Sequence, residues 1–172
     1  MLGERDRAIG HLSAVVAADP LALRERLLLS DLLLGSRRPQ EVLTLLEPAP
    51  EVDGVLIRRV LATEMQGGRA TAEREELARR FKLNLDLGLT AHAREEARYF
   101  LEIAGDPALA LARAEVNWAL QHEVEDAQLL VDAAVAAGRP EAAKPVVTWM
   151  AEQKVVVPAL RLPVSVMEAA AR

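Results

Sequence analysis

Residues 105–120 read GDPALALARAEVNWAL, and residues 138–153 read GRPEAAKPVVTWMAEQ. Each stretch opens with glycine, a charged residue and proline, continues with an alanine-rich run, and carries valine two positions before tryptophan. The second turn follows the first by 33 residues, and weaker copies of the opening begin at Gly3, Gly35 and Gly68. A period in the low thirties with one glycine turn in each copy is typical of stacked helical hairpins.

The composition favours an all-α fold. Of the 172 residues, 51% are hydrophobic and 27% are charged, so the chain has enough apolar surface to fold. Aromatic residues make up only 3%, and the abundant alanine, leucine, arginine and glutamate are strong helix formers. With few large rings to fill space, the core requires helices that approach closely. We therefore expect Ala110 and Ala143 at close helix crossings, with Trp118 and Trp149 filling space between hairpins.

Apolar spacing predicts nine helices, over residues 4–18, 21–34, 39–47, 52–66, 70–85, 91–104, 107–121, 125–137 and 140–153. Asp19 and Thr90 are predicted N-caps, and Ser165 with Glu168 predicts a capping box for a short terminal helix. Pro145 is expected to kink the last of the nine helices near its start. Together these elements make about five hairpins over residues 1–157, followed by a C-terminal extension over 158–172.

Residues 81–89 alternate apolar and polar side chains, which is the period of a β-strand. A single strand would have no partner in a helical chain. The segment is therefore interpreted as an extended linker or a stretched helix end. The interval between turns also lengthens here, because Gly68 and Gly105 are 37 residues apart.

Several classes of function are disfavoured. The formal charge of −5 gives no basic excess for nucleic acid, and the pairs Arg37-Arg38, Arg58-Arg59 and Arg79-Arg80 are expected to be solvated. No apolar stretch approaches the ~20 residues that span a bilayer. The chain has no cysteine, so neither the cytoplasm nor the periplasm is excluded as its compartment.

The N-terminus begins at the position of a turn inside a hairpin. We therefore expect that the apolar face formed by Ile9, Leu12 and Val16 lacks half its cover. Either further upstream sequence or another subunit would then bury it, and the latter would make the N-terminal helix a site of oligomerisation.

The chain resembles the tetratricopeptide repeat family. Gly3, Asp6, Ala8, Ile9 and Leu12, followed by Ala17 and Asp19-Pro20, are similar to the second half of that repeat. Ala127, Leu130, Val131, Ala134 and Gly138 are similar to its first half, although alanine or leucine stands at most of its large aromatic positions. Residues 91–149 look like the alanine-rich repeats of bacterial members. The resemblance implies a right-handed superhelix whose concave groove binds proteins or peptides.

No constellation of residues predicts catalysis or a bound cofactor. His92 and Glu95 share a helical face, but no second pair of this kind completes a metal site. His122 is expected in an exposed turn. The adjacent carboxylates Glu75-Glu76 and Glu95-Glu96 diverge by about 100° on a helix and are expected to be solvated. A helical enzyme or metal carrier that uses His92 is kept as a minor alternative to a non-enzymatic protein.

The candidate binding residues lie on the first helices of the hairpins, which line the groove in this family. Arg94, Arg98 and Glu102 form a ladder at intervals of four, and Tyr99 lies on a neighbouring stripe. Arg58 and Arg59 lie on the preceding first helix. Together they would suit an acidic peptide. The alternative is that Arg98 pairs with Glu102 inside the molecule and that Tyr99 only packs.

The expected function is therefore a scaffold or adaptor that binds a protein or peptide partner. The alternative is a structural or assembly subunit, in which the repeat stack packs on another chain. The asparagines and lysines that capture the acidic C-terminus of heat-shock chaperones in this family are absent from the first helices, so that dicarboxylate clamp is excluded.

Overall fold

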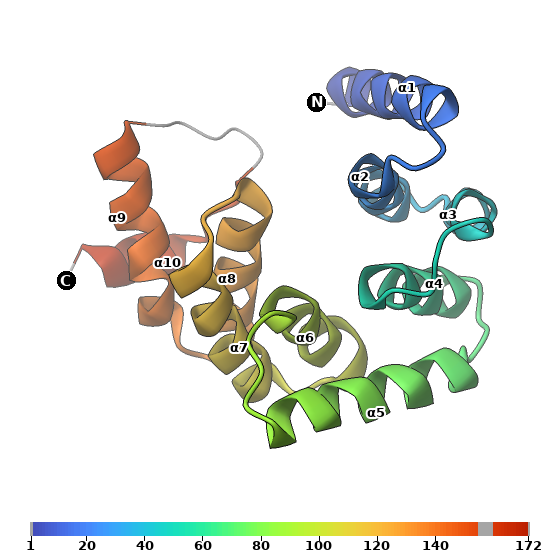
Figure 1. Cartoon of the computed structure of the whole chain (residues 1–172). Helices are drawn as coiled ribbons and strands as arrows, with labels where there is room; N and C mark the ends of the chain where they lie inside the picture. The colour runs from blue at the N-terminus through green and yellow to red at the C-terminus, as the bar shows by residue number, and fades with distance from the viewer. Residues whose placement is uncertain (1, 155–159, 172) are drawn as a thin grey trace. The chain divides into compact units, whose positions relative to one another are not determined.

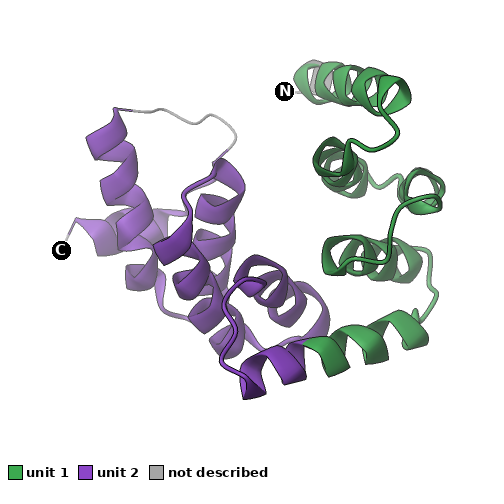
Figure 2. Ribbon diagram, in the orientation of Figure 1, with its two compact units in different colours: residues 1–80 green, residues 81–172 purple. Residues whose placement is uncertain are grey.

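The computed structural model describes residues 2–154 and 160–171, and every regular element in these ranges is a helix (Figure 1). The predicted all-α class is confirmed. Residues 1–80 and 81–172 form two compact units, unit 1 and unit 2 (Figure 2). The α-helices of the described ranges are α1 (Leu2–Ala18), α2 (Leu23–Gly35), α3 (Pro39–Leu46), α4 (Asp53–Met65), α5 (Thr71–Asp86), α6 (Ala93–Tyr99), α7 (Pro107–Leu120), α8 (Val124–Ala136), α9 (Lys144–Gln153) and α10 (Val164–Ala170). A π-helix, η1 (Phe100–Ala104), continues α6, and a 3₁₀-helix, η2 (Pro140–Ala143), precedes α9.

In unit 1, each helix from α1 to α4 packs on the next, and α2 also contacts α4. Val42, Leu46 and Val55 are fully buried in its core. Ile9 and Val16 of α1 are only 8% exposed. The prediction that this face of the first helix lacks cover is therefore wrong, because α1 packs it on α2 within the same unit.

In unit 2, α6 packs on α7 and α7 on α8, and α6 also contacts α8. Its core contains many alanines, and Ala97, Ala110, Ala134 and Ala143 are fully buried. Their small side chains permit the close approach of helices that the scarcity of aromatic residues requires. The expected burial of Ala110 and Ala143 is confirmed.

The two glycine turns that open the sequence repeats have the same backbone conformation. Gly105 has φ +69° and Gly138 has φ +68°, the left-handed region that glycine adopts without steric cost. After Gly138, the Arg139 N–H donates to the Ala134 carbonyl at 2.8 Å, which closes the end of α8. After Gly105, the Asp106 side chain accepts from the Leu109 N–H at 3.0 Å and caps α7. The repeated glycine therefore serves as a helix terminator.

The predicted N-caps are wrong because the helices begin later or earlier than their capping signals. Asp19 accepts from the N–H of Leu21 at 2.9 Å and closes a turn ahead of α2. Thr90 lies two residues before His92, which holds the N-cap position of α6 without a side-chain hydrogen bond. Ser165 lies inside α10, whose N-cap is a proline.

Residues 81–86 are helical, so the alternation of this segment belongs to the end of α5. Of the two interpretations, the helix end is correct here and the extended linker is wrong. Phe81 is fully buried, whereas Leu83 and Leu87 are 50% and 63% exposed. Leu83 on α5 and Leu87 in the turn just after it therefore both face solvent.

The C-terminal helices α9 and α10 pack within unit 2. Pro145 lies in the first turn of α9, and the expected kink is a change from the 3₁₀-helix η2 to the α-helix α9. Helix α10 contacts η2, α9 and α8, and its Val166 is fully buried. The domain boundary predicted between residues 157 and 158 lies outside the described residues.

Candidate functional site

The six predicted groove residues fall into two sets. Arg58 and Arg59 lie on α4 in unit 1, whereas Arg94, Arg98 and Tyr99 on α6 and Glu102 on η1 lie in unit 2. Convergence of the two sets in one groove stays a prediction. Within each unit, the structure shows which partners these side chains have.

Arg58 joins α4 to α2. Its side chain is 10% exposed, and its guanidinium donates to both carboxylate oxygens of Asp31, at 3.0 and 2.5 Å. It also donates to the carbonyls of Leu27 and Gly54, at 3.1 and 2.8 Å. The neighbouring Arg59 donates to the Leu46 carbonyl at 2.7 Å. The expectation that Arg58 is solvated is wrong, because two helices bury it.

Arg94 occupies the corresponding role in unit 2, where it joins α6 to α8. Its Nη2 donates to Glu123 and Asp126, at 2.8 and 2.9 Å, and its Nε lies 2.7 Å from Asp126 Oδ1. Burial opposes the charge of Arg94, but hydrogen bonds to the two carboxylates outweigh it and raise its pKa. Asp126 is 1% exposed and also accepts from Asn117 Nδ2 at 2.7 Å.

Arg98 and Glu102 form the internal pair that the sequence offers as an alternative to ligand binding, with Arg98 Nε 3.1 Å from Glu102 Oε1. Tyr99 is 8% exposed and packs its ring against Phe81 and Phe100, with centroid separations of 5.1 and 5.2 Å. Tyr99 therefore contributes to the core of unit 2.

One carboxylate that was expected in solvent is buried. Glu96 on α6 is 0% exposed and forms an ion pair with Arg113 on α7. The expectation for Glu96 is therefore wrong. No local pattern indicates this pair, because Arg113 lies 17 residues after Glu96 in the sequence.

In unit 2, an aromatic cluster joins α7 to α9, the two helices that carry the repeated tryptophans. The ring centroids of Trp118 and Trp149 are 5.7 Å apart and their planes are perpendicular, an edge-to-face arrangement. His122 is exposed in the turn before α8, as expected, and its ring lies 4.3 Å from Trp118. The repeated tryptophans thus pack on each other, which supports their interpretation as space-filling residues.

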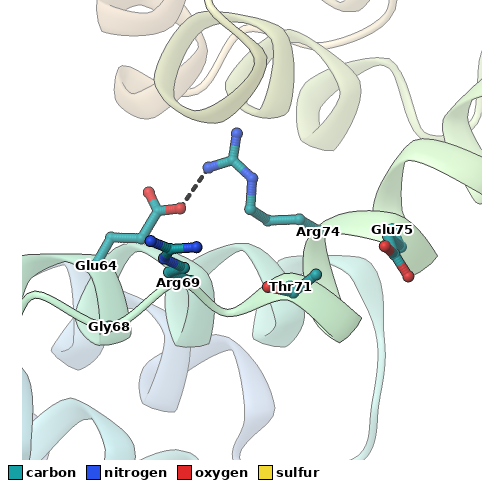
Figure 3. Close-up of a pocket in the computed structure, with 6 residues that line it drawn as sticks. All are labelled: Glu64, Gly68, Arg69, Thr71, Arg74 and Glu75. Carbon is teal, nitrogen blue, oxygen red and sulfur yellow. Dashed lines mark hydrogen bonds and ion pairs between the residues drawn. The ribbon is translucent and has the colours of Figure 1, made fainter.

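A depression of about 550 Å³ lies at the turn between α4 and α5 in unit 1. In Figure 3, Glu64 and Arg74 point toward each other across it and form an ion pair, while Arg69 lies beside Glu64. Glu75 points away from this pair. Arg74 already neutralises the Glu64 carboxylate, and the lining contains no buried nucleophile. The depression therefore shows no catalytic arrangement.

Sequence reasoning missed the contact between α8 and residues 160–163, which are not helical. The Arg161 N–H donates to Gln128 Oε1 at 2.8 Å, and Gln128 Nε2 donates to the Arg161 carbonyl at 3.5 Å. Both partners are common surface residue types 33 positions apart, so no local pattern indicates their contact.

In the described ranges, no group of three or more His, Asp or Glu side chains is arranged to hold a metal ion. No helix there is long and apolar enough to cross a membrane. The chain matches no protein-family model, no curated protein and no solved structure.

Proposed function

We propose that the chain is a non-catalytic scaffold that binds a protein or peptide partner on its helices, in the manner of tetratricopeptide repeats. A right-handed stack of hairpins with a concave groove is part of this proposal. It is supported by the contacts of α2 with α4 and of α6 with α8, in addition to the contacts between sequential helices. Such contacts between alternate helices are what a stack of hairpins requires.

The observation that carries the proposal is the pair of hydrogen bonds between the Gln128 side chain and the main chain of Arg161. A carboxamide offers one acceptor and two donors, so it can pair with the N–H and the carbonyl of one residue at once. Contacts to the main chain are the usual basis on which a protein binds an extended peptide, while nearby side chains give the specificity. Unit 2 therefore already holds a stretch of non-helical chain in this way.

The proposal is tested by selecting peptides from a random display library on the immobilised full-length protein. We expect peptides that bind with Kd values below about 100 μM, which corresponds to a weak binding free energy of about −5.5 kcal/mol. If acidic peptides are recovered, Arg98→Ala should weaken them, because it removes a predicted groove cation. Arg94 is unsuitable for this test, since its loss leaves Asp126 buried without its cation. A library that yields no binder to the folded protein, nor to a folded variant in which Leu160→Asp releases residues 160–163 from α8, would reject the scaffold function.

A second candidate is an assembly subunit, favoured by the exposed leucines at the end of α5. Leu83, Leu87 and Leu89 are 50%, 63% and 44% exposed, and neighbouring exposed leucines often mark a contact with another chain. Light scattering during size-exclusion chromatography tests this candidate. An oligomer that persists on dilution and dissociates in the variant Leu83→Lys/Leu87→Lys would favour it, and a monomer at all concentrations would count against self-assembly.

A further inference from the structure

Residues 160–163 lie against α8 in a non-helical conformation and lead into α10. Leu160 is 9% exposed, whereas Arg161 is exposed. The two hydrogen bonds that join Gln128 of α8 to this segment use the main chain of Arg161, not its side chain. A sequence of the same backbone conformation could therefore replace it.

Asp132, one turn after Gln128 on α8, orients the carboxamide. Gln128 Nε2 donates to Asp132 Oδ1 at 2.8 Å, which leaves Oε1 to accept from the Arg161 N–H. Asp132 is exposed on α8, but partial desolvation still raises its pKa, while its hydrogen bond from Gln128 and the positive charge of Arg161 act against that rise. The negative charge of Glu102 also raises the pKa of Asp132. A basic residue at the position of Arg161 is thus attracted to the carboxylate of Asp132.

We propose that Gln128 and Asp132 form a binding seat for an extended peptide with an arginine between two leucines. Residues 160–163, Leu-Arg-Leu-Pro, occupy this seat as an internal ligand that a partner displaces. This proposal rests on the proposed scaffold function and names its site, its partner chemistry and its regulation. The partner carries the same apolar, basic, apolar pattern as the segment that it replaces.

The covalent tether sets how strongly the internal ligand competes. A tethered segment acts at an effective concentration on the order of millimolar, so a free peptide binds the closed protein much more weakly than an open one. Opening the seat should therefore raise the affinity for a free peptide at least tenfold. The segment is held by a hydrogen bond of 2.8 Å, a longer one of 3.5 Å and the burial of Leu160. A single substitution should therefore be enough to release it.

The test uses full-length proteins and a fluorescein-labelled synthetic peptide with the sequence of residues 160–165, LRLPVS. Fluorescence anisotropy gives its Kd for the wild type and for Leu160→Asp, which opens the seat by placing a charge at a buried apolar position. The released variant is then combined with Gln128→Ala or with Gln153→Ala. Gln153 is an exposed glutamine at the end of α9 and provides the matched control.

We expect Leu160→Asp to bind the peptide at least tenfold more tightly than the wild type. Gln128→Ala in that background should weaken binding about tenfold, because two main-chain hydrogen bonds are lost. Gln153→Ala should leave the Kd unchanged, and a peptide with glutamate in place of its arginine should bind more weakly. Circular dichroism checks the fold. If Leu160→Asp is unfolded, Arg161→Pro opens the seat instead by removing the N–H that donates to Gln128.

The inference is overturned if a folded released variant binds the peptide no more tightly than the wild type, or if Gln128→Ala has no effect. Its failure is distinguishable from failure of the scaffold function. Library peptides that bind the wild type independently of Gln128 would leave the scaffold function standing and overturn the seat. Peptide binding to a released variant, after an empty library selection on the wild type, would support a seat that the chain itself blocks.

Discussion

Removing the carboxylate of Asp126 should destabilise unit 2 more than any surface substitution. The side chain is 0% exposed and lies within 2.9 Å of three groups: Arg94, Asn117 Nδ2 and the Glu123 N–H. Asp126→Ala leaves these donors without their acceptor in a site that water enters poorly. A buried donor that loses its partner costs about 1–3 kcal/mol, and a broken buried ion pair about 3–5 kcal/mol.

We take about 3 kcal/mol as the expected loss in the free energy of unfolding, because Arg94 retains 27% exposure and its contact with Glu123. Urea denaturation followed by tryptophan fluorescence measures it. Both tryptophans of the chain, Trp118 and Trp149, lie in unit 2, so the signal reports on that unit. Far-ultraviolet circular dichroism in the same titration follows the helices of the whole chain.

Asp86→Ala is the matched control, since Asp86 forms an exposed ion pair with Lys82 four residues earlier. Pairs of this kind contribute only about 0.3–0.5 kcal/mol. A double-mutant cycle with Arg94→Ala should give a smaller loss for the double variant than the sum of the single losses. A decrease below about 1 kcal/mol for Asp126→Ala would refute the argument, since it is the size expected of an exposed pair.

Three further predictions concern packing, turns and pH. Ala110→Leu adds bulk at a fully buried position and should lower the free energy of unfolding by about 1–3 kcal/mol in urea denaturation; an unchanged value would contradict the close crossing. Gly10→Ala, inside α1 with no atom beyond the local helix backbone within 4 Å of the new Cβ, should raise the melting temperature, whereas Gly138→Ala, at φ +68°, should lower it. Hydrogen bonds from Arg79, which has the larger effect, and from Arg80 lower the pKa of Glu76 from 4.5 to about 2. The stabilisation from these bonds is therefore complete above pH 4.5 and is lost as the pH falls toward 2; a carboxyl titration by NMR should show a midpoint near 2 that rises in Arg79→Ala.

The helices of this chain could be predicted because their signals are local. Gly138 and Pro140 end one helix and start the next within three residues, and the apolar spacing of each helix is contained in its own sequence. Capping was harder to predict. Thr90 and Ser165 have favourable residue types, but the first helical turn is set by packing, which placed His92 and Pro163 at the caps.

The partners of the candidate site residues could not be predicted from local patterns. Arg58 meets Asp31 and Arg94 meets Asp126 across 27 and 32 positions of sequence, and each pair depends on which helices contact each other. The pair Arg98 and Glu102 was predictable, since four residues is one helical turn. The same limit hid the contact of Gln128 with Arg161, which joins a helix to a segment with no periodicity of its own.

The π-helix η1 changes the angular register of α6, the helix that it continues. In this wider turn the Asp106 N–H reaches back six residues, to the Phe100 carbonyl at 2.9 Å, whereas the equivalent N–H of Arg139 reaches back five. One additional residue is accommodated without a loop, and each residue of an α-helix accounts for about 100° of rotation. Side chains before and after η1 therefore follow two helical phases, so a repeat alignment that runs through Phe100–Ala104 without a gap would assign the residues beyond it to the wrong face.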